Sequence, residues 1–256
     1  MTTDVADIAR TALSVLPAPA PDLAARLAAY LRLLLEANEG VNLVSRKDTH
    51  AHVARFTHEC LFLARLLSDE LEARKHTVAD PRGAQASIEP ARLLDLGSGG
   101  GFPGLILKLA IPGAETTLVE GTQKKARFLA DACRKLDLRG ITVIWARAEA
   151  LVASSSPYYK PALRRHFDWV TAKALGSLRE SLDLAAPFLR PGGEHWTFKG
   201  PGYEAEVAGC RRRLAQLHCR MLRVERVPGD KESYVLAVQR QPDAPGNVSR
   251  ETSSPE

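Results

Sequence analysis

Residues 91–113, ARLLDLGSGGGFPGLILKLAIPG, place several glycines close together behind an apolar segment. Gly97, Gly99 and Gly101 spell G-x-G-x-G, and the glycines from Gly99 to Gly104 also spell G-x-G-x-x-G. Either spacing lets a turn between a strand and a helix bring its backbone close to a ligand, because glycine adopts conformations that other residues avoid. The first spacing favours the methyl donor S-adenosylmethionine (SAM), and the second favours a dinucleotide.

Two acids bear on the choice between these ligands. Asp95 stands two residues before Gly97, where a carboxylate repels a pyrophosphate but suits a ligand that carries an ammonium group. Glu120 ends the next predicted strand, where an acid can accept both ribose hydroxyls of either ligand. Asp95, the glycines and Glu120 together favour SAM over a dinucleotide. The alternative without a ligand is a tight structural turn with two solvated acids.

The elements that must position these residues alternate along the chain. Apolar segments predict strands at 91–96, 115–120, 141–146, 167–173 and 194–200, and helical patterns lie near 103–110, 123–137, 177–189 and 203–217. This alternation predicts a doubly wound parallel α/β sheet. Two further strands, at 221–227 and 233–240, are joined by a short turn and should form an antiparallel hairpin. A parallel sheet completed by such a hairpin is the Rossmann-like layout of class I SAM-dependent methyltransferases.

The residues before this sheet predict a helical layer. Leu23, Leu27, Leu31 and Leu34 recur at helical spacing within 21–38, and a second helix should follow Asp48. We therefore expect three parts: an N-terminal helical extension over 1–80, a methyltransferase domain over 81–240, and a disordered tail over 241–256 that is rich in Pro, Ser and charge.

Charge and composition indicate which partners and compartments suit the protein. The 256 residues carry a net charge of +5, which permits a nucleic-acid partner without demonstrating one. No apolar run is long enough to span a membrane, and the N-terminal residues lack a basic segment, so we expect no secretory signal. The four cysteines (Cys60, Cys133, Cys210 and Cys219) form no C-x-x-C pair. We therefore expect reduced structural thiols, no metal site, a cytoplasmic location and no need for more than a monomer.

Longer motifs give the sequence a family resemblance. LLDLGSGGGFPGLILKLAIP, LVEGTQKKARFL, ARAEAL, AKALGSL and FKG occur in this order, after VNLVSRKD and ARFTHECL. Over roughly residues 25 to 240 the chain resembles the bacterial glucose-inhibited division protein B family. That family methylates N7 of a guanine at position 527 in the 530 loop of 16S ribosomal RNA, so the resemblance implies a SAM-dependent methyltransferase whose partner is 16S rRNA or the small ribosomal subunit.

The resemblance also implies roles for individual residues. Beside Asp95 and Gly99, which we infer from the turn itself, the cofactor-binding residues that it implies are Gly97, Phe102, Glu120, Ala148, Glu149 and Lys173. Lys199 matches the lysine of the family's KG pair. Three residues depart from the family pattern: Lys173 stands where an arginine is usual, Phe56 where a histidine is usual, and Glu59 where an aspartate is usual.

Methylation of guanine N7 requires little acid–base catalysis from the protein. N7 has a lone pair and no proton to lose, so we expect catalysis by alignment and no dedicated base or nucleophile. Lys173 and Lys199 follow predicted strands and are candidates for positioning the substrate. Phe102 and Trp196 are candidates for stacking on a base, although Trp196 is better explained as a core residue. The SPYY segment that begins at Ser156 precedes its strand and lacks a second proline, so we interpret it as a loop.

The sequence leaves the RNA-binding surface and the substrate class open. Basic residues that could meet phosphates, or could equally form solvated helix faces, are Arg46, Lys47, Arg55, Lys124, Lys125, Arg127, Arg211, Arg212, Arg213 and Arg220. A methyltransferase of the same fold that acts on another RNA or a small molecule is an alternative, as is a non-catalytic ribosome-assembly factor.

Overall fold

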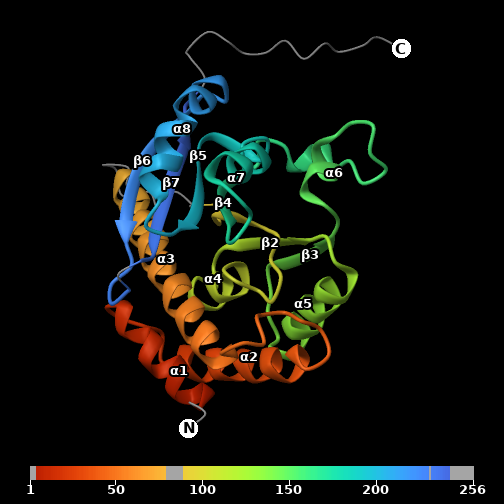
Figure 1. Cartoon of the computed structure of the whole chain (residues 1–256), viewed down its shortest axis with the longest axis vertical. Helices are drawn as coiled ribbons and strands as arrows, with labels where there is room; N and C mark the ends of the chain where they lie inside the picture. The colour runs from red at the N-terminus through yellow and green to blue at the C-terminus, as the bar shows by residue number, and fades with distance from the viewer. Residues whose placement is uncertain (1–3, 79–88, 231, 243–256) are drawn as a thin grey trace.

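The computed structural model of the chain describes residues 4–78, 89–230 and 232–242. Within them one sheet contains seven strands: β1 (Arg92–Leu96), β2 (Glu115–Glu120), β3 (Ile141–Trp145), β4 (Phe167–Ala172), β5 (Leu189–Lys199), β6 (Cys219–Arg226) and β7 (Tyr234–Arg240). Their order is β3-β2-β1-β4-β5-β7-β6, with β1 to β5 parallel and β7 antiparallel to both of its neighbours (Figure 1). The predicted doubly wound sheet and its antiparallel hairpin are confirmed.

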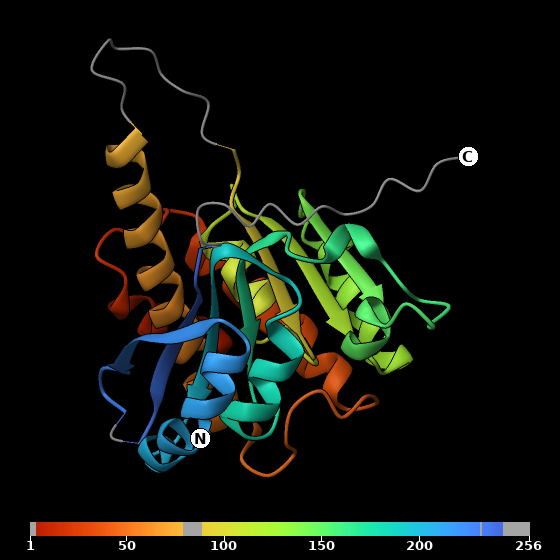
Figure 2. The same cartoon turned by 90° about the horizontal axis from the view of Figure 1, so that it is seen from above.

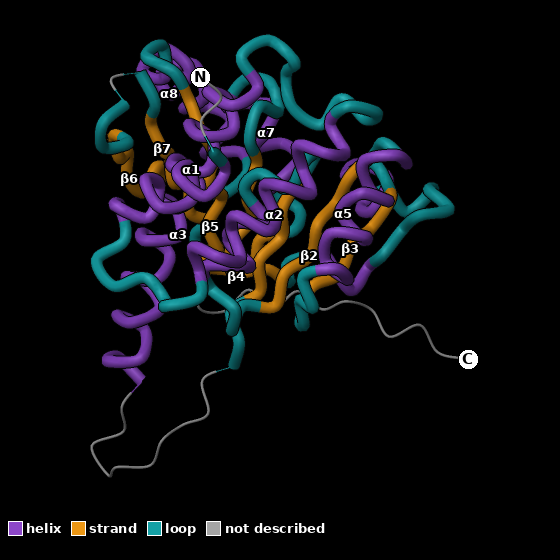
Figure 3. The backbone as a smooth tube through the Cα atoms, turned by 90° about the horizontal axis from the view of Figure 1, so that it is seen from below, coloured by secondary structure: helices purple, strands orange, loops and turns teal. Residues whose placement is uncertain are grey.

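Helices cover both faces of this sheet. They are α1 (Val5–Ala12), α2 (Leu23–Asn38), α3 (Thr49–Val78), α4 (Gly104–Ala110), α5 (Gln123–Lys135), α6 (Ala148–Val152), α7 (Leu178–Ala185) and α8 (Tyr203–Gln216). Successive residues of β1 point to opposite faces, because Leu93 packs in the cluster formed with α2 to α5 while Leu94 packs in the cluster formed with α6 and α7. Figure 3 shows α2 and α5 lying across the first of these faces.

The N-terminal helices belong to the same core as the sheet. Leu27, Leu31 and Leu34 of the predicted stripe on α2 are fully buried, and they share one hydrophobic cluster with Leu93 of β1 and Trp169 of β4. Figure 2 shows the long helix α3 on the side of the molecule opposite to β3. The helical layer and the sheet therefore share one hydrophobic core.

Four elements differ from the sequence-based expectation. The helix predicted at 177–189 ends at Ala185, and β5 begins at Leu189 instead of 194. A shift in register between β4 and β5 lets Gly193 approach the chain so closely that a Cβ atom there would lie 2.7 Å from the Phe167 carbonyl oxygen. Pro191 and the glycines after it therefore occupy an irregular stretch of strand that lies before the predicted start at residue 194. The short helices α1 and α6 had not been predicted.

Two parts of the predicted domain division fall outside the described residues. The boundary near residue 80 lies within 79–88, and nearly all of the predicted disordered tail lies within 243–256. None of the described helices is both long enough and apolar enough to cross a membrane.

Candidate cofactor and substrate site

The chain turns sharply between β1 and α4, at the carboxyl edge of the sheet. Gly97, Gly99 and Gly101 have φ angles of 67°, 55° and 103°, a region that residues with a side chain rarely adopt. These are the three glycines of the G-x-G-x-G spacing. A Cβ atom at Gly99 would meet only the Gly97 carbonyl oxygen, at 3.7 Å, so the turn leaves its backbone open around Gly99.

Gly104 has a different role in the same segment. It is the first residue of α4, and a Cβ atom there would lie 2.5 Å from Leu118 Cδ2 and 2.6 Å from Asp95 Cβ. Only glycine allows α4 to pack this closely on β1 and β2. Both glycine spacings therefore have a structural reason, and the glycines alone do not decide between SAM and a dinucleotide.

Asp95 provides the evidence that separates the two ligands. It is fully buried, and its Oδ2 accepts a hydrogen bond of 3.1 Å from the backbone N–H of Gly104, while its Oδ1 accepts one of 2.8 Å from Thr171 Oγ1. Burial raises the pKa of Asp95 to about 6, even though these hydrogen bonds act in the opposite direction. A dinucleotide's pyrophosphate needs the free N–H groups at the start of this helix. Asp95 already accepts the Gly104 N–H from behind the turn, so this N–H is not free for a phosphate, which favours a ligand without one.

Glu120 lies across the turn from Asp95, at the end of β2. Its Oε2 accepts a hydrogen bond of 2.8 Å from Gly99 N, and its Oε1 accepts one of 2.7 Å from Thr122 N. A carboxylate offers about four acceptor positions, so each oxygen can accept one further hydrogen bond. Glu120 thus shapes the glycine turn and still has acceptor capacity for a pair of hydroxyl groups.

The next strand brings a third segment to the same edge. Trp145, the last residue of β3, pairs in register with Glu120, and Ala146 N donates to the Glu120 carbonyl oxygen at 3.1 Å. Ala148 and Glu149 then open α6, with Ala148 half-buried and Glu149 exposed. The structure thereby places the glycine turn, Glu120 and the 148–149 pair at the carboxyl ends of three adjacent parallel strands, where ligands bind in open α/β sheets.

Lys173 follows β4 and faces α3 across the sheet edge. Its ammonium group is paired with Glu59 and lies 4.3 Å from the ring centroid of Phe56 and 4.4 Å from that of Phe198. Ser233 Oγ donates to the other oxygen of Glu59 at 2.8 Å. Lys173 therefore contacts both Phe56 and Glu59, the two other positions at which the resemblance implies a departure.

Lys199 holds the loop that follows Lys173. At the end of β5, its buried ammonium group donates to the Gly176 carbonyl oxygen at 2.8 Å and pairs with Glu206 at 2.9 Å. Lys199 thus joins the loop after β4 to the start of α8. Its contacts fit a positioning role for that loop.

The two aromatic candidates for base stacking are both buried. Trp196 is fully buried, which confirms its interpretation as a core residue, and its indole N–H donates to Glu194 at 3.1 Å. Phe102 is 7% exposed and packs edge-on between Tyr30 and Phe56, with centroid distances of 6.0 and 5.6 Å. Phe102 therefore connects the glycine turn to the helical layer.

The basic residues predicted from the sequence do not converge on one point. Arg55 is half-exposed beside Glu59, with an Nε–Oε1 distance of 3.9 Å, and so lies next to Lys173. Arg213 is paired with Asp183 on α7, and Arg220 donates to Gln239 on β7. Of these three basic residues, Arg55 is the one whose contacts place it beside the candidate site.

Sequence reasoning missed the residues that support the site from a distance along the chain. Tyr30, Thr171, Phe198 and Ser233 each contact a candidate residue or the glycine turn from another element. Neither the residue types nor their spacing in the sequence predicts these contacts. The SPYY segment forms part of the loop between α6 and β4, as expected, with Tyr158 exposed.

Comparison with known proteins identifies the family that carries this arrangement. The model of a family described as rRNA small subunit methyltransferase G matches residues 23–235. The chain belongs to this family. The match begins at the first residue of α2 and includes every candidate residue of the site, while α1 lies outside it.

Curated members of the family cover much of the chain. A protein from Sorangium cellulosum is 40% identical over 184 residues, which are 72% of this chain and 67% of the relative. One from Roseiflexus castenholzii is 36% identical over 65% of this chain and 69% of the relative, and one from Limosilactobacillus reuteri is 31% identical over 90% and 88%. All three are named ribosomal RNA small subunit methyltransferase G.

Proposed function

We propose that this chain transfers a methyl group from SAM to N7 of a guanine in 16S ribosomal RNA, at position 527 in the 530 loop. The observation that carries the proposal is the family match over residues 23–235, together with a glycine turn whose helix start is occupied by Asp95. Because the substrate is ribosomal RNA, the site of action is the cytoplasm. We further propose a monomer as the active unit, which sedimentation of the protein in solution tests.

The residues of the turn fit SAM. The open backbone around Gly99 and the remaining acceptor positions of Glu120 suit the ribose, and the backbone of Ala148 and Glu149 at the neighbouring strand end suits the adenine. Gly97 and Phe102 shape the two ends of the turn. Asp95 supports the site from behind, because its carboxyl group is fully buried. When bound, SAM supplies an activated methyl group on a sulfonium centre.

The protein's own task is then alignment. N7 of guanine needs no base to remove a proton, so a site that holds N7 in line with the methyl group is sufficient, and such orientation can contribute several kcal/mol. Lys173 stands at the carboxyl end of β4, adjacent in the sheet to β1 and its glycine turn. We assign Lys173, and Lys199 behind it, to positioning the substrate and the loop that contacts it. Arg55, half-exposed on the neighbouring helix, is suited to an RNA phosphate.

Cofactor choice is tested first by thermal melts with SAM, S-adenosylhomocysteine and NAD. A ligand at about 100 times its dissociation constant adds about 2.7 kcal/mol of stability, which raises the Tm of a chain of this size by roughly 5–10 °C. We expect this shift with the two SAM-type ligands and none with NAD. A shift with NAD alone would contradict the proposal.

Methyl transfer is tested with labelled SAM on four substrates: small ribosomal subunits, naked 16S rRNA, large subunits and transfer RNA. We expect label in small-subunit RNA and none in the last two. Binding to the small subunit without transfer would instead indicate an assembly factor.

A further inference from the structure

Tyr30 reaches the glycine turn from the helical layer. Its hydroxyl group donates a hydrogen bond of 2.6 Å to the Gly100 carbonyl oxygen, although the two residues are 70 positions apart. A Cβ atom at Gly101 would lie 2.9 Å from this hydroxyl oxygen, and the Tyr30 ring packs edge-on against Phe102. One side chain of α2 therefore contacts three consecutive residues of the turn.

The helical layer around Tyr30 fits the same part of the turn closely. A Cβ atom at Gly100 would lie 3.0 Å from Leu34 Cδ1 and 3.5 Å from Leu43 Cβ. Asn38 Oδ1 accepts hydrogen bonds from Leu43 N at 2.7 Å and Val44 N at 3.0 Å, which fixes the segment that carries Leu43. The turn thus lies against a surface built from α2 and the residues that follow it.

Tyr30 and Glu120 hold neighbouring groups of the turn from different elements. Glu120 of β2 accepts from Gly99 N, and Tyr30 of α2 donates to Gly100 O, so adjacent glycines are fixed by one side chain each. Tyr30 is fully buried, and this burial raises the pKa of its hydroxyl group well above the usual value. The hydroxyl therefore keeps its proton and remains a donor at any pH at which the protein is studied.

We propose that Tyr30 is a positioning residue of the cofactor site, which acts from the helical layer to hold the Gly99–Gly100 backbone in the shape that binds SAM. The inference rests on the proposed function, because it assumes that this turn binds SAM. Three glycines with positive φ give the turn considerable conformational freedom. An external hydrogen bond to its centre limits that freedom before the ligand arrives, and such preorganisation strengthens binding.

The test is Tyr30→Phe, which keeps the ring and removes the hydroxyl group. Titration calorimetry with SAM and S-adenosylhomocysteine gives the Kd and the number of sites per folded molecule. We expect Kd to rise about 5- to 10-fold with full stoichiometry, since one hydrogen bond to a buried carbonyl is lost. In methyl transfer, KM for SAM should rise by a similar factor, while kcat at saturating SAM and KM for RNA stay within about 2-fold of the wild-type values.

Ser181→Ala is the matched control. It removes a buried hydroxyl group on α7 that donates to the Leu178 carbonyl oxygen at 3.1 Å and makes no hydrogen bond to the glycine turn in the described part of the chain. We expect its Kd for SAM to equal that of the wild type, whatever its Tm.

An unchanged Kd for Tyr30→Phe, or a lower number of sites with unchanged Kd, would overturn the inference and leave Tyr30 a purely structural residue. Failure of the wild-type protein to bind SAM would overturn the proposed function itself, and the inference with it.

Discussion

The ammonium group of Lys173 lies between the rings of Phe56 and Phe198 and is paired with the carboxylate of Glu59. A cation over an aromatic face gains electrostatic energy, and more so when it is largely removed from water. Phe56 contributes one of these faces from α3, and Glu59 contributes the charge from the same helix. The ammonium group of Lys173 therefore has its contacts from α3 and β5, and they hold a cation at the end of β4.

Replacing Lys173 with methionine should impair methyl transfer strongly. The substitution removes the cation that we assign to substrate positioning, and misplacing a substrate by about 1 Å can cost about 100-fold in rate. We expect a loss of that order in kcat/KM for small subunits, with a smaller change in Kd for SAM. Wild-type transfer by folded Lys173→Met protein would contradict the assignment.

The stability of the same variant needs its own control. Glu59 is 3% exposed, so removing its partner leaves a buried charge and should lower the free energy of unfolding by about 3–5 kcal/mol. The double variant Glu59→Gln with Lys173→Met removes both charges and should recover most of this stability without recovering activity. Denaturant unfolding of the single and double variants measures the difference.

Glu120→Gln should weaken SAM binding while RNA binding is retained. Hydrogen bonds to a charged acceptor contribute about 1.5–3 kcal/mol, so we expect Kd for SAM to rise roughly 10- to 100-fold. Glu115→Gln is the matched control, since Glu115 is exposed at the other end of the same strand. Equal Kd values for the two variants would argue against the role of Glu120.

Gly104→Ala should distort the site through packing alone. The added methyl group would lie 2.5 Å from Leu118 Cδ2 and 2.7 Å from Asp95 Oδ2, so α4 must shift, at a cost of about 1–3 kcal/mol. We expect a lower Tm and weaker SAM binding. Gly113→Ala, where a Cβ atom meets nothing within 4 Å, should change neither quantity. A Gly104→Ala protein with wild-type Tm would show that the helix adapts freely.

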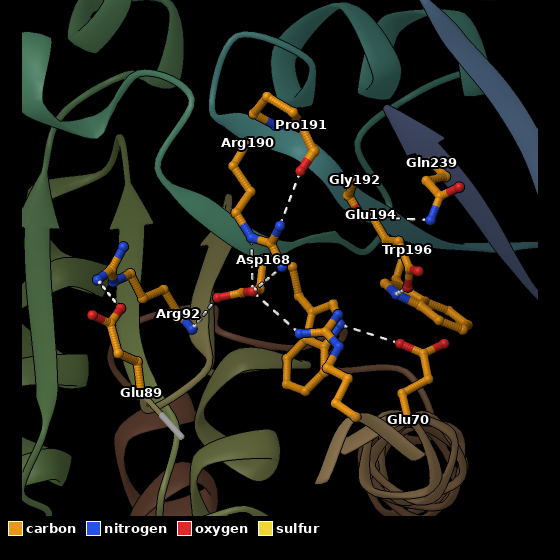
Figure 4. A network of polar contacts seen from close by, with 12 residues as sticks. Glu70, Glu89, Arg92, Asp168, Arg190, Pro191, Gly192, Glu194, Trp196 and Gln239 are labelled. Carbon is orange, nitrogen blue, oxygen red and sulfur yellow. Dashed lines mark hydrogen bonds and ion pairs between the residues drawn. The ribbon is translucent and has the colours of Figure 1, made fainter. Parts of the chain in front are cut away.

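A carboxylate pair near the C-terminal end of α3 predicts an unusual pH dependence of stability. Glu70 of α3 interacts with Glu194 of β5, and both are labelled in Figure 4. Glu70 also accepts hydrogen bonds from Trp169 Nε1 at 3.3 Å and from Arg223 at 3.0 Å, and its pKa is affected by the charge of Arg74. Burial, followed by the interaction with Glu194, raises the pKa of Glu70 to about 8, although Arg223 and Arg74 act in the opposite direction. The folded protein thus holds a proton that the unfolded chain loses near pH 4.5.

Because the folded state binds more protons in this interval, the contribution of Glu70 to stability falls as the pH rises from about 4.5 to 8 and is constant above that range. Glu194→Gln removes the like charge and should lower the pKa of Glu70. Each unit of that decrease adds about 1.4 kcal/mol of stability above pH 8. Urea unfolding of the wild type and of Glu194→Gln at pH 5, 7 and 8.5 measures how the free energy of unfolding depends on pH. A pH profile identical to that of the wild type would show that Glu194 does not control Glu70.

Much of the fold follows from local patterns in the sequence. The strands at 115–120 and 141–145 and the helix over α2 were predicted within one or two residues, because apolar periodicity reports which face of an element is buried. The start of β5 was misplaced, since the register shift opposite Phe167 depends on its pairing with β4 and leaves no signal in Pro191 or Gly192.

Contacts within the candidate site were predictable where a motif or the end of a predicted strand indicates them, as for the glycine turn and Glu120. The glycine turn and Asp95 lie within ten residues, whereas Glu59 and Lys173 are 114 positions apart and Tyr30 and Gly100 are 70 apart. Such contacts depend on how α2 and α3 pack against the sheet. The burial of Asp95 was missed for the same reason, because its partner Thr171 comes from β4.

The proposed reaction transfers one methyl group to N7 of one guanine in small-subunit RNA. The most direct measurement treats small subunits from a strain that lacks this gene with the protein and SAM, and then maps N7-methylguanine by aniline cleavage. We predict a single new cleavage at position 527 of the 530 loop, greatly reduced with Glu120→Gln at low SAM concentration. No cleavage at that guanine, by wild-type protein shown to bind SAM, would contradict the claim.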